Sequence, residues 1–226
     1  MAIAPGFGAD TLVDAFTGWE PIGTSNNDQA DWVQAQNSVG DNLAEVSMND
    51  RNEATVSYVA TTAAPTIPTV GQVTTTGGFI VVGVSCEGNH DAVATMQLTL
   101  IKWDDNMDTV DNLFAPLANS AAFPCGTSGF GLTGSMIGLA AGTAGGDVQS
   151  ISYSLGVDTP TAADKVGDHL AVELINAREE VSENWIGEVN QAGLTANYNV
   201  DSTEVTTSHT EHDTTTVTTH RYIART

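Results

Sequence analysis

The sequence has few basic side chains. Its 226 residues include 6 Lys and Arg against 28 Asp and Glu, which gives a formal net charge of −22 at pH 7. A surface of this sign repels nucleic-acid phosphates, so we expect no tight binding of DNA or RNA. The same charge suits a surface past which DNA slides without sticking, and it equally suits a protein adapted to high salt. Both explanations stay open at this stage.

Cysteines and long apolar runs are also scarce. Cys86 and Cys125 are the only cysteines, whereas a small secreted domain held by disulfides normally has more. We interpret both as buried thiols, with a disulfide between them as the alternative. The first residues, MAIAPGFGADTLVDAF, lack the basic segment and apolar run of a signal peptide. The longest small-apolar stretch, 136–144, is too short to span a bilayer. We expect a protein made in a cytoplasm and not bound to a membrane.

Side chains arranged for catalysis are missing from the sequence. No G-x-S-x-G motif is present, and Lys102 and Lys165 are the only lysine amines. Neither cysteine has a cluster of basic neighbours that would lower the pKa of its thiol. Carboxylates are spread so widely that no pair stands out as an acid and a base. We therefore predict that the protein is not an enzyme and has no catalytic residues.

Two short motifs suggest ligand sites, and each has a simpler explanation. Residues 129–134 have the G-x-G-x-x-G spacing of a dinucleotide loop, but no strand precedes them and no βαβ pattern follows. The acids of 104–108 alternate as in an EF-hand, yet Thr109 and Ala115 stand where that loop needs Gly and Glu. We predict no cofactor and no metal residues, and a weak divalent-cation site near Asp104 to Asp108 stays open.

The histidine-rich stretch TTSHTEHDTTTVTTH, residues 206–220, suggests a zinc site. On one strand, His209 and Glu211 share a face while His212 lies on the other, so the ligands do not converge as zinc requires. We interpret these histidines as exposed residues of a turn and a strand. A weak divalent-cation site over His209 to Asp213 is the alternative.

An internal repeat is the main positive signal. VGDNLAEVSMNDRNE from Val39 and VGDHLAVELINAREE from Val166 are identical at eight of fifteen positions without a gap, at an offset of 127 (166 − 39). Residues 53–62, EATVSYVATT, alternate as a strand does, and two copies should share one fold. We therefore assign both copies to β structure, although 162–184 alone have the spacing of an amphipathic helix. In each copy we expect turns at Val-Gly-Asp and at the Asn-x-Arg that follows, near 49–52 in the first copy.

A second pair of segments extends the repeat towards the C-terminus. Two apolar strands, 79–86 and 93–103, flank turn residues and are predicted to form a hairpin. Aligning His90-Asp91 with His212-Asp213 predicts an equivalent hairpin at an offset of 122 (212 − 90).

These patterns predict a mainly β fold of two related antiparallel modules from an internal duplication, arranged as a sandwich or half-barrel. The expected units are an N-terminal arm (1–28), a first module (29–117), a Gly/Ala-rich connector or arm (118–147) and a second module (148–226). Strands are expected near 30–36, 43–49, 53–62, 78–87, 93–103, 148–157, 170–176, 180–189, 194–209 and 214–223. One short helix is expected at 109–117, capped by Asp108 and limited by Pro116.

The order of segments GDNLAEVSMNDRNEATVSYVA, APTIPTVGQV and GGFIVVGVSCEGNHDAVATMQLTLIKW resembles tail-tube structural proteins of tailed bacteriophages. The resemblance covers 29–103 and, through the repeat, part of 148–226. It implies a virion protein, made in the host cytoplasm, whose β subunits form homo-oligomeric rings stacked around a channel. DNA would pass an acidic lumen without specific binding, and other virion proteins would be partners.

The resemblance departs from the family in one respect, because its subunit often holds a single β module. Two modules imply either a three-fold ring with pseudo-six-fold symmetry or two halves of one domain. We expect residues 1–28 and 127–146 to make contacts between subunits. The alternative function is a capsid-decoration, head-fibre or adhesin-like tandem β binding module.

Overall fold

The computed structural model describes residues 16–36, 38–75, 77–103, 122–142, 146–163, 169–195, 197–207 and 212–224. The fold is mainly β, as predicted, and the only helical elements in these ranges are the 3₁₀ turns η1 (Thr127–Gly129) and η2 (Gln191–Gly193). The described part of 162–184 is strand and not helix, so the repeat was a better guide than the spacing. The helix predicted at 109–117 lies outside the described residues.

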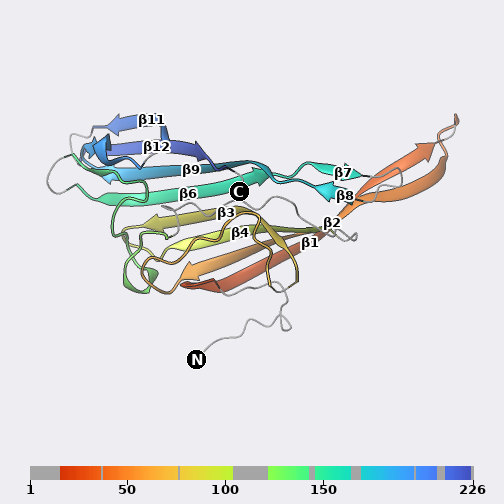
Figure 1. Ribbon diagram of the computed structural model, residues 1–226, viewed down its shortest axis with the longest axis horizontal. Helices are drawn as coiled ribbons and strands as arrows, with labels where there is room; N and C mark the ends of the chain where they lie inside the picture. The colour runs from red at the N-terminus through yellow and green to blue at the C-terminus, as the bar shows by residue number, and fades with distance from the viewer. Residues whose placement is uncertain are drawn as a thin grey trace, which may run out of the picture.

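Eight long strands form one antiparallel sheet (Figure 1). They are β1 (Trp19–Gln36), β2 (Asn42–Ala60), β3 (Ile80–Asn89), β4 (Thr95–Trp103), β6 (Val148–Asp158), β9 (Ile175–Ile186), β11 (Asn199–Thr206) and β12 (Thr214–Tyr222). Their order across the sheet is β1-β2-β4-β3-β6-β9-β12-β11. Two small sheets pair β5 (Ala140–Ala141) with β10 (Val189–Asn190), and β7 (Thr161–Ala163) with β8 (His169–Val172). The long strands thus make a single layer and not two packed sheets, and β1 takes in residues 19–28 that were expected in an arm.

The two halves of this sheet have the same strand order. In each half the first, second, fourth and third strands lie side by side, and β3 of the first half pairs with β6 of the second. Val56 of β2 pairs with Thr24 of β1. In the second half, Glu183 of β9 pairs with Ile151 of β6. Glu183 corresponds to Val56 and Ile151 to Thr24, each at an offset of 127 (183 − 56 and 151 − 24). This is the offset of the sequence repeat.

The second hairpin of each half is in equivalent register as well. Leu98 of β4 pairs with Val84 of β3, and Val217 of β12 pairs with Thr203 of β11. Both pairs are related by an offset of 119 (217 − 98 and 203 − 84). The alignment through the His-Asp dipeptides used an offset of 122, so it is wrong by three positions. Two identical residues were too weak a signal, whereas backbone pairing sets the register over a whole strand.

The turn predicted near 49–52 is a bulge inside one continuous strand. β2 runs through this segment, and its pairing with β1 is irregular just after Gln29. The same irregularity recurs just after Gly156 in the pairing of β6 with β9. Opposite it lies Asn176, whose φ is 53°. Asn tolerates this left-handed conformation in a bulge as it does in a turn. An Asn in the sequence therefore does not distinguish a turn from a bulge.

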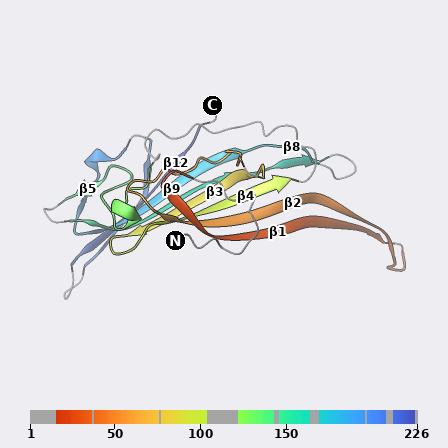
Figure 2. The same cartoon turned by 90° about the horizontal axis from the view of Figure 1, so that it is seen from below.

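Each half extends beyond the common sheet as a hairpin arm (Figures 1 and 2). β2 pairs with β4 only as far as Arg51, and from there to Asn42 it pairs with β1 alone. In the second half the arm is interrupted at Pro160 and Glu173, and beyond them only β7 and β8 pair. Proline has no N–H for the ladder, which ends regular pairing there. The first arm is therefore continuous and the second is broken.

Long connections cover one face of the sheet and complete the core. Phe123 and Ile137, from the segment between the two halves, are fully buried, and so is Val70 from the connection between β2 and β3. The described part of 127–146 thus packs on the sheet of its own chain, with Met136 and Leu139 also buried. This Gly/Ala-rich segment therefore contributes to the core of its own chain, and its contacts with neighbouring subunits stay a prediction.

Candidate assembly surface

The uncovered face of the sheet is lined by small polar side chains. Because side chains alternate along a strand, every second residue points to this face. One row of paired residues crosses all eight strands, from Gly23 through Ser57, Gln97, Ser85, Ser154, Glu180 and His220 to Asn199. None of these residues is buried. The face is therefore a hydrated surface without an apolar patch along this row.

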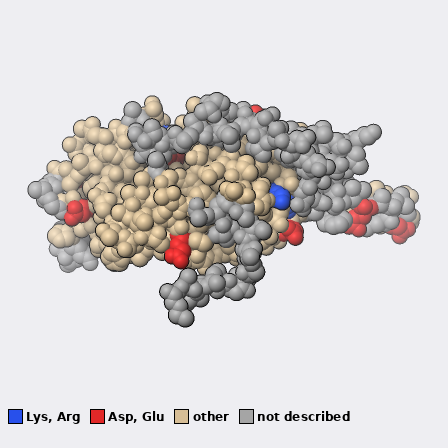
Figure 3. Space-filling view, turned by 60° about the horizontal axis from the view of Figure 1, so that its bottom comes forward, with Lys and Arg blue, Asp and Glu red and all other residues tan. Residues whose placement is uncertain are grey.

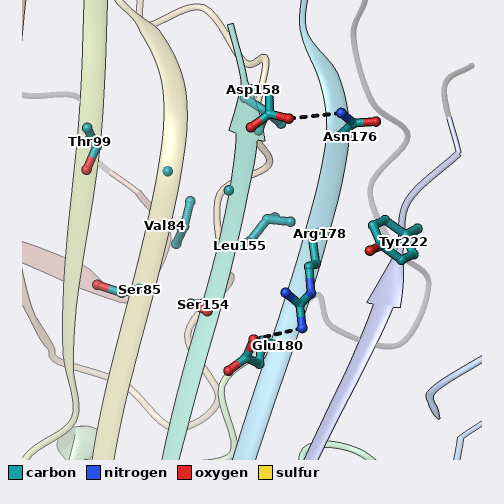
Figure 4. A pocket seen from close by; sticks show the side chains of 13 residues that line it. Val84, Ser85, Thr99, Ser154, Leu155, Asp158, Asn176, Arg178, Glu180 and Tyr222 are labelled. Atoms are coloured by element: carbon teal, nitrogen blue, oxygen red, sulfur yellow. Dashed lines mark hydrogen bonds and ion pairs between the residues drawn. The ribbon is translucent and has the colours of Figure 1, made fainter. Parts of the chain in front are cut away.

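A groove of about 830 Å³ lies in the middle of this face, where the two halves meet (Figure 4). Its charged groups have partners: Asn176 Nδ2 donates to Asp158 at 2.9 Å, and Arg178 lies 3.3 Å from Glu180. Hydroxyl groups such as those of Ser85 and Ser154 form the rest of the polar lining. The amide of Asn176 and the charges of Asp158, Arg178 and Glu180 are thus paired with one another, and the lining of the groove is mainly polar.

Two ion pairs occupy equivalent places on the open face. Arg51 Nε lies 2.8 Å from Glu53, and the pair Arg178–Glu180 follows it at the repeat offset of 127 (178 − 51 and 180 − 53). These four residues are among the identical positions of the repeat. Pairs this exposed stabilise the fold by at most about 1 kcal/mol. Their main consequence is electrostatic, because both arginines of these strands are neutralised by a neighbouring carboxylate.

The surface that remains is acidic and hydrophilic. Glu87 of β3 and Glu204 of β11 are exposed on the open face. The first arm also carries acidic side chains, among them the exposed Asp41 and Glu45, and red groups on the arm are visible in Figure 3. A polyanion brought to such a surface is repelled and not bound.

Among the described residues, the edge strands β1 and β11 each have a strand partner on one side only. All eight residues of β11 are exposed, and Ile22 on β1 and Val205 on β11 are exposed by 58% and 56%. The strands in the same positions inside the sheet, β6 and β3, are paired on both sides and bury Tyr153 and Cys86. Edges of this length leave rows of backbone N–H and C=O groups free to pair with another strand.

A buried carboxylate holds the covering segment on the second half. Glu183 is fully buried and accepts hydrogen bonds from Ser135 Oγ at 2.9 Å, from the Met136 N–H at 2.6 Å and from Trp185 Nε1 at 3.1 Å. Burial raises the pKa of Glu183, and these hydrogen bonds oppose the rise. The carboxylate thus acts as an anchor for residues 135–137, because it satisfies donors that no apolar side chain could satisfy.

A second buried charge lies beside it on β9. Glu179 is fully buried and forms an ion pair with Arg221 of β12, whose guanidinium carbon lies 4.1 Å from the centre of the Tyr198 ring. Burial, and then the charge of Glu179, raise the pKa of Tyr198. The phenol therefore stays neutral, and the buried ion pair with the ring beside it forms a structural cluster in which Glu179 Oε1 has no hydrogen-bond partner among the described residues.

The glycine motif and the cysteines have structural roles in the described residues. Residues 129–134 form a turn in which Gly129 has φ of 76°, and a Cβ there would lie 2.4 Å from the backbone oxygen of Ala60. The glycine at 129 thus allows a close approach of two backbone segments. Cys86 and Cys125 are free and buried, as predicted. Burial raises the pKa of both thiols, and for Cys86 the neighbouring Cys125 adds to the rise.

The histidines and acids singled out by the sequence are only partly described. His209 and Glu211 lie outside the described residues, as do 104–108. His212 is exposed beside a strand, and His220 Nδ1 lies 2.5 Å from Asp201. Among the described residues, no group of three or more His, Cys, Asp or Glu side chains could hold a metal ion.

Comparison with known proteins finds no relative: no family model, no curated protein and no solved structure matches the chain. In the part of the chain that the structure describes, no helix is long and apolar enough to cross a membrane. The two open edges and the polar face between them are the features that sequence reasoning missed. A signal was present in NVDSTEVT of β11, which is mostly polar and has only two valines, as suits a strand whose residues are all exposed.

Proposed function

We propose that the protein is a self-assembling structural protein, most specifically a tail-tube subunit of a tailed bacteriophage virion. The observation that carries this proposal is the junction between the two halves. There the third strand of one unit, β3, pairs with the first strand of the next unit, β6. The same two positions at the ends of the sheet, β11 and β1, have open edges. Each chain thus contains one complete junction, between β3 and β6. Its edge strands β11 and β1 could each supply one strand of a further junction with another chain.

A junction of this kind is heterologous, since it joins two different edges. Heterologous contacts repeat from copy to copy and produce a closed ring or an open helix. Two equivalent units per chain, derived on this proposal from a duplication, would let three chains form a ring of six units. The matched strand order, and the repeat offset that relates β1 to β6 and β2 to β9, support this origin.

The open face suits the inside of such a ring. It is lined by Ser, Thr, Gln and Asn, its arginines Arg51 and Arg178 are paired with glutamates, and Glu87 is exposed on it. With a net charge of −22, the wall of the channel repels DNA and gives it no site to bind. DNA would then be a passing cargo and other virion proteins would be the partners at the tube ends.

The two ends of the sheet along the strand direction, as distinct from its edge strands, differ in a way that suits stacked rings. The arms lie at one end. At the other end Val93 and Phe130 form a bridge and are exposed by 38% and 54%. Stacking would bring the arm end of one ring against this apolar end of the next.

Electron microscopy of the purified protein tests the proposal. We expect rings or tubes, with assembly favoured by raised salt, because screening weakens the repulsion between acidic chains. Val205→Pro, which removes an N–H from the edge of β11, should prevent assembly, and Val205→Thr, which keeps that N–H and a β-branched side chain, is the matched control. Monomers at high protein concentration under every salt condition would reject the proposal. Monomers or trimers that bind a capsid surface would instead favour the decoration or adhesin-like function.

A further inference from the structure

We infer that β11 of one chain pairs with β1 of the next in a defined antiparallel register, with Glu204 opposite Asn27 and Thr206 opposite Ser25. This inference rests on the proposed head-to-tail assembly and adds the residues that meet. The partner is a second copy of this chain, because the surface that β3 presents to β6 inside the chain is repeated, strand for strand, by β11 and β1 at its ends.

The register follows from pairings that already exist. Ser85 of β3 lies opposite Ser154 of β6. Glu204 occupies the position of Ser85, since their strands are related by an offset of 119 (204 − 85). Asn27 occupies the position of Ser154, since their strands are related by an offset of 127 (154 − 27). The equivalent contact between chains is therefore Glu204 with Asn27.

The neighbouring pair extends this register by two residues. Glu87 lies opposite Ser152 in the internal junction, and the same offsets convert these residues into Thr206 and Ser25. Regular pairing without a bulge runs from Ser202 to Thr206 on β11 and from Gly23 to Gln29 on β1. The stretch from Ser202 to Thr206 would thus meet residues 25–29 of β1, which lie within the regular part of that strand.

Charge and side-chain direction favour this register over its nearest alternatives. A shift of one residue in one direction would set Glu204 against Asp28, and like charges directly opposite each other destabilise a strand pair. It would also turn one whole strand over, so that the polar rows of the two chains no longer lay on the same face. A shift by two residues keeps the faces and is the alternative that an experiment has to separate.

The junction between chains differs from the internal one in what it buries. Inside the chain, Cys86 and Tyr153 meet on the covered face and are both buried. Their equivalents at the edges are Val205 and Asn26, both exposed in the single chain. Backbone hydrogen bonds would therefore supply most of the affinity between chains, which makes the contact reversible and suits subunits that must stay soluble before assembly.

Paired cysteines test the register directly. Residues opposite each other on antiparallel strands have Cα atoms about 4.5–5.5 Å apart, within the range of a disulfide, whereas diagonal neighbours are about 7–8 Å apart. The test variant is Asn27→Cys with Glu204→Cys. The matched control is Asn27→Cys with Ser202→Cys, which is two residues out of register on the same face. Within one chain these strands are seven strand spacings apart, roughly 34 Å, so any bond joins two chains.

The assembled variants are oxidised, their remaining thiols are blocked, and covalent oligomers are separated without reductant. We expect the Asn27–Glu204 variant to give about tenfold more covalently linked chains than the control pair. For a three-fold ring the main product would be a closed trimer. The native Cys86 and Cys125 are buried, and the three variants with one added cysteine measure the background.

Imaging of the same samples under reducing conditions separates the two proposals. If rings or tubes form but the control pair links as well as or better than the test pair, the register is wrong and the proposed function stands. If rings or tubes form and neither pair links, the edges do not meet as inferred and the register is again overturned. If the wild-type chain never assembles, the proposed function fails and the register fails with it.

Discussion

The two halves of the sheet share one strand order but fill their covered faces differently. In the first half, Val56 and Leu98 lie opposite each other and are fully buried. At the same positions of the second half lie Glu183 and Val217, which are equally buried. Further along, Arg221 of the second half pairs with Glu179 inside the protein, whereas Lys102 of the first half is exposed.

This difference shows that the fold requires burial at those positions and not an apolar side chain. Strand order depends on pairing and on alternation, which both halves keep. The covered face accepts either apolar side chains or charged ones, and its buried carboxylates lie beside partners such as Ser135 for Glu183 and Arg221 for Glu179. A polar core is more sensitive to the loss of one partner, because the group left behind stays buried and unpaired. The comparison therefore predicts a different response of each half to substitution.

The largest effect is expected from breaking the buried ion pair. Arg221→Leu leaves the carboxylate of Glu179 without its cation and should lower the free energy of unfolding by about 3–5 kcal/mol. Lys102→Leu is the matched control in the first half (221 − 102 = 119), and should change stability by about 0.5 kcal/mol or less. Denaturant unfolding followed by circular dichroism measures both. Equal losses in the two variants would show that the buried pair has no special weight.

A smaller effect is expected from cutting the apolar core of the first half. Leu98→Ala leaves a cavity beside the covering loops and should lower the free energy of unfolding by about 2–5 kcal/mol. Val217→Ala at the equivalent position removes less volume and should lower it by roughly 1–2 kcal/mol. The same unfolding measurement applies. A larger loss from Val217→Ala would mean that the second half depends on apolar packing more than its buried charges indicate.

A change with pH is expected from Glu183. Its pKa in the folded state lies above its ordinary value of 4.5, so the folded protein holds the proton more tightly than the unfolded chain. The contribution of this group to stability is then full below pH 4.5 and is lost as the pH rises through the folded pKa. Glu183→Gln lacks this loss. As the pH rises from 4.5, the free energy of unfolding of Glu183→Gln should increase relative to that of the wild type, by at most about 1.4 kcal/mol per pH unit. A constant or declining difference would contradict the assignment.

The smallest effect is expected at the bulge of the second half. Asn176 has φ of 53°, a conformation that costs an alanine about 1 kcal/mol and costs glycine nothing. Asn176→Ala should therefore be less stable than Asn176→Gly by about that amount. Thermal unfolding of the two variants under the same conditions makes the comparison. Equal melting temperatures would show that the bulge relaxes into an ordinary strand.

Much of the strand content could be predicted from alternation and from the repeat. The repeat rejected the helical spacing of 162–184, and the described residues there are strands. The turn at 49–52 was predicted wrongly because Asn supports the same left-handed backbone in a turn and in a bulge. The contribution of the Gly/Ala-rich segment to the core was not predicted, since its composition does not show that Ile137 and Leu139 are buried.

The candidate assembly surface was harder to predict because it depends on which strands become neighbours. Ser85 and Ser154 are far apart in the chain, yet they lie opposite each other across the central junction. The local sequence of neither strand indicates which strand it pairs with. The open edges of β1 and β11 likewise exist only because six other strands lie between them.

The sequence by itself determined the β class, the acidic charge and the repeated segment, because alternation, composition and self-similarity are properties of the chain read in order. Only the tertiary structure decided the head-to-tail junction of β3 with β6, the row of polar side chains across eight strands and the burial of Glu179 with Arg221. The physical reason is that hydrogen bonds between strands join residues that are distant in the chain. Which partner each strand finds is settled by the register and burial of the whole sheet.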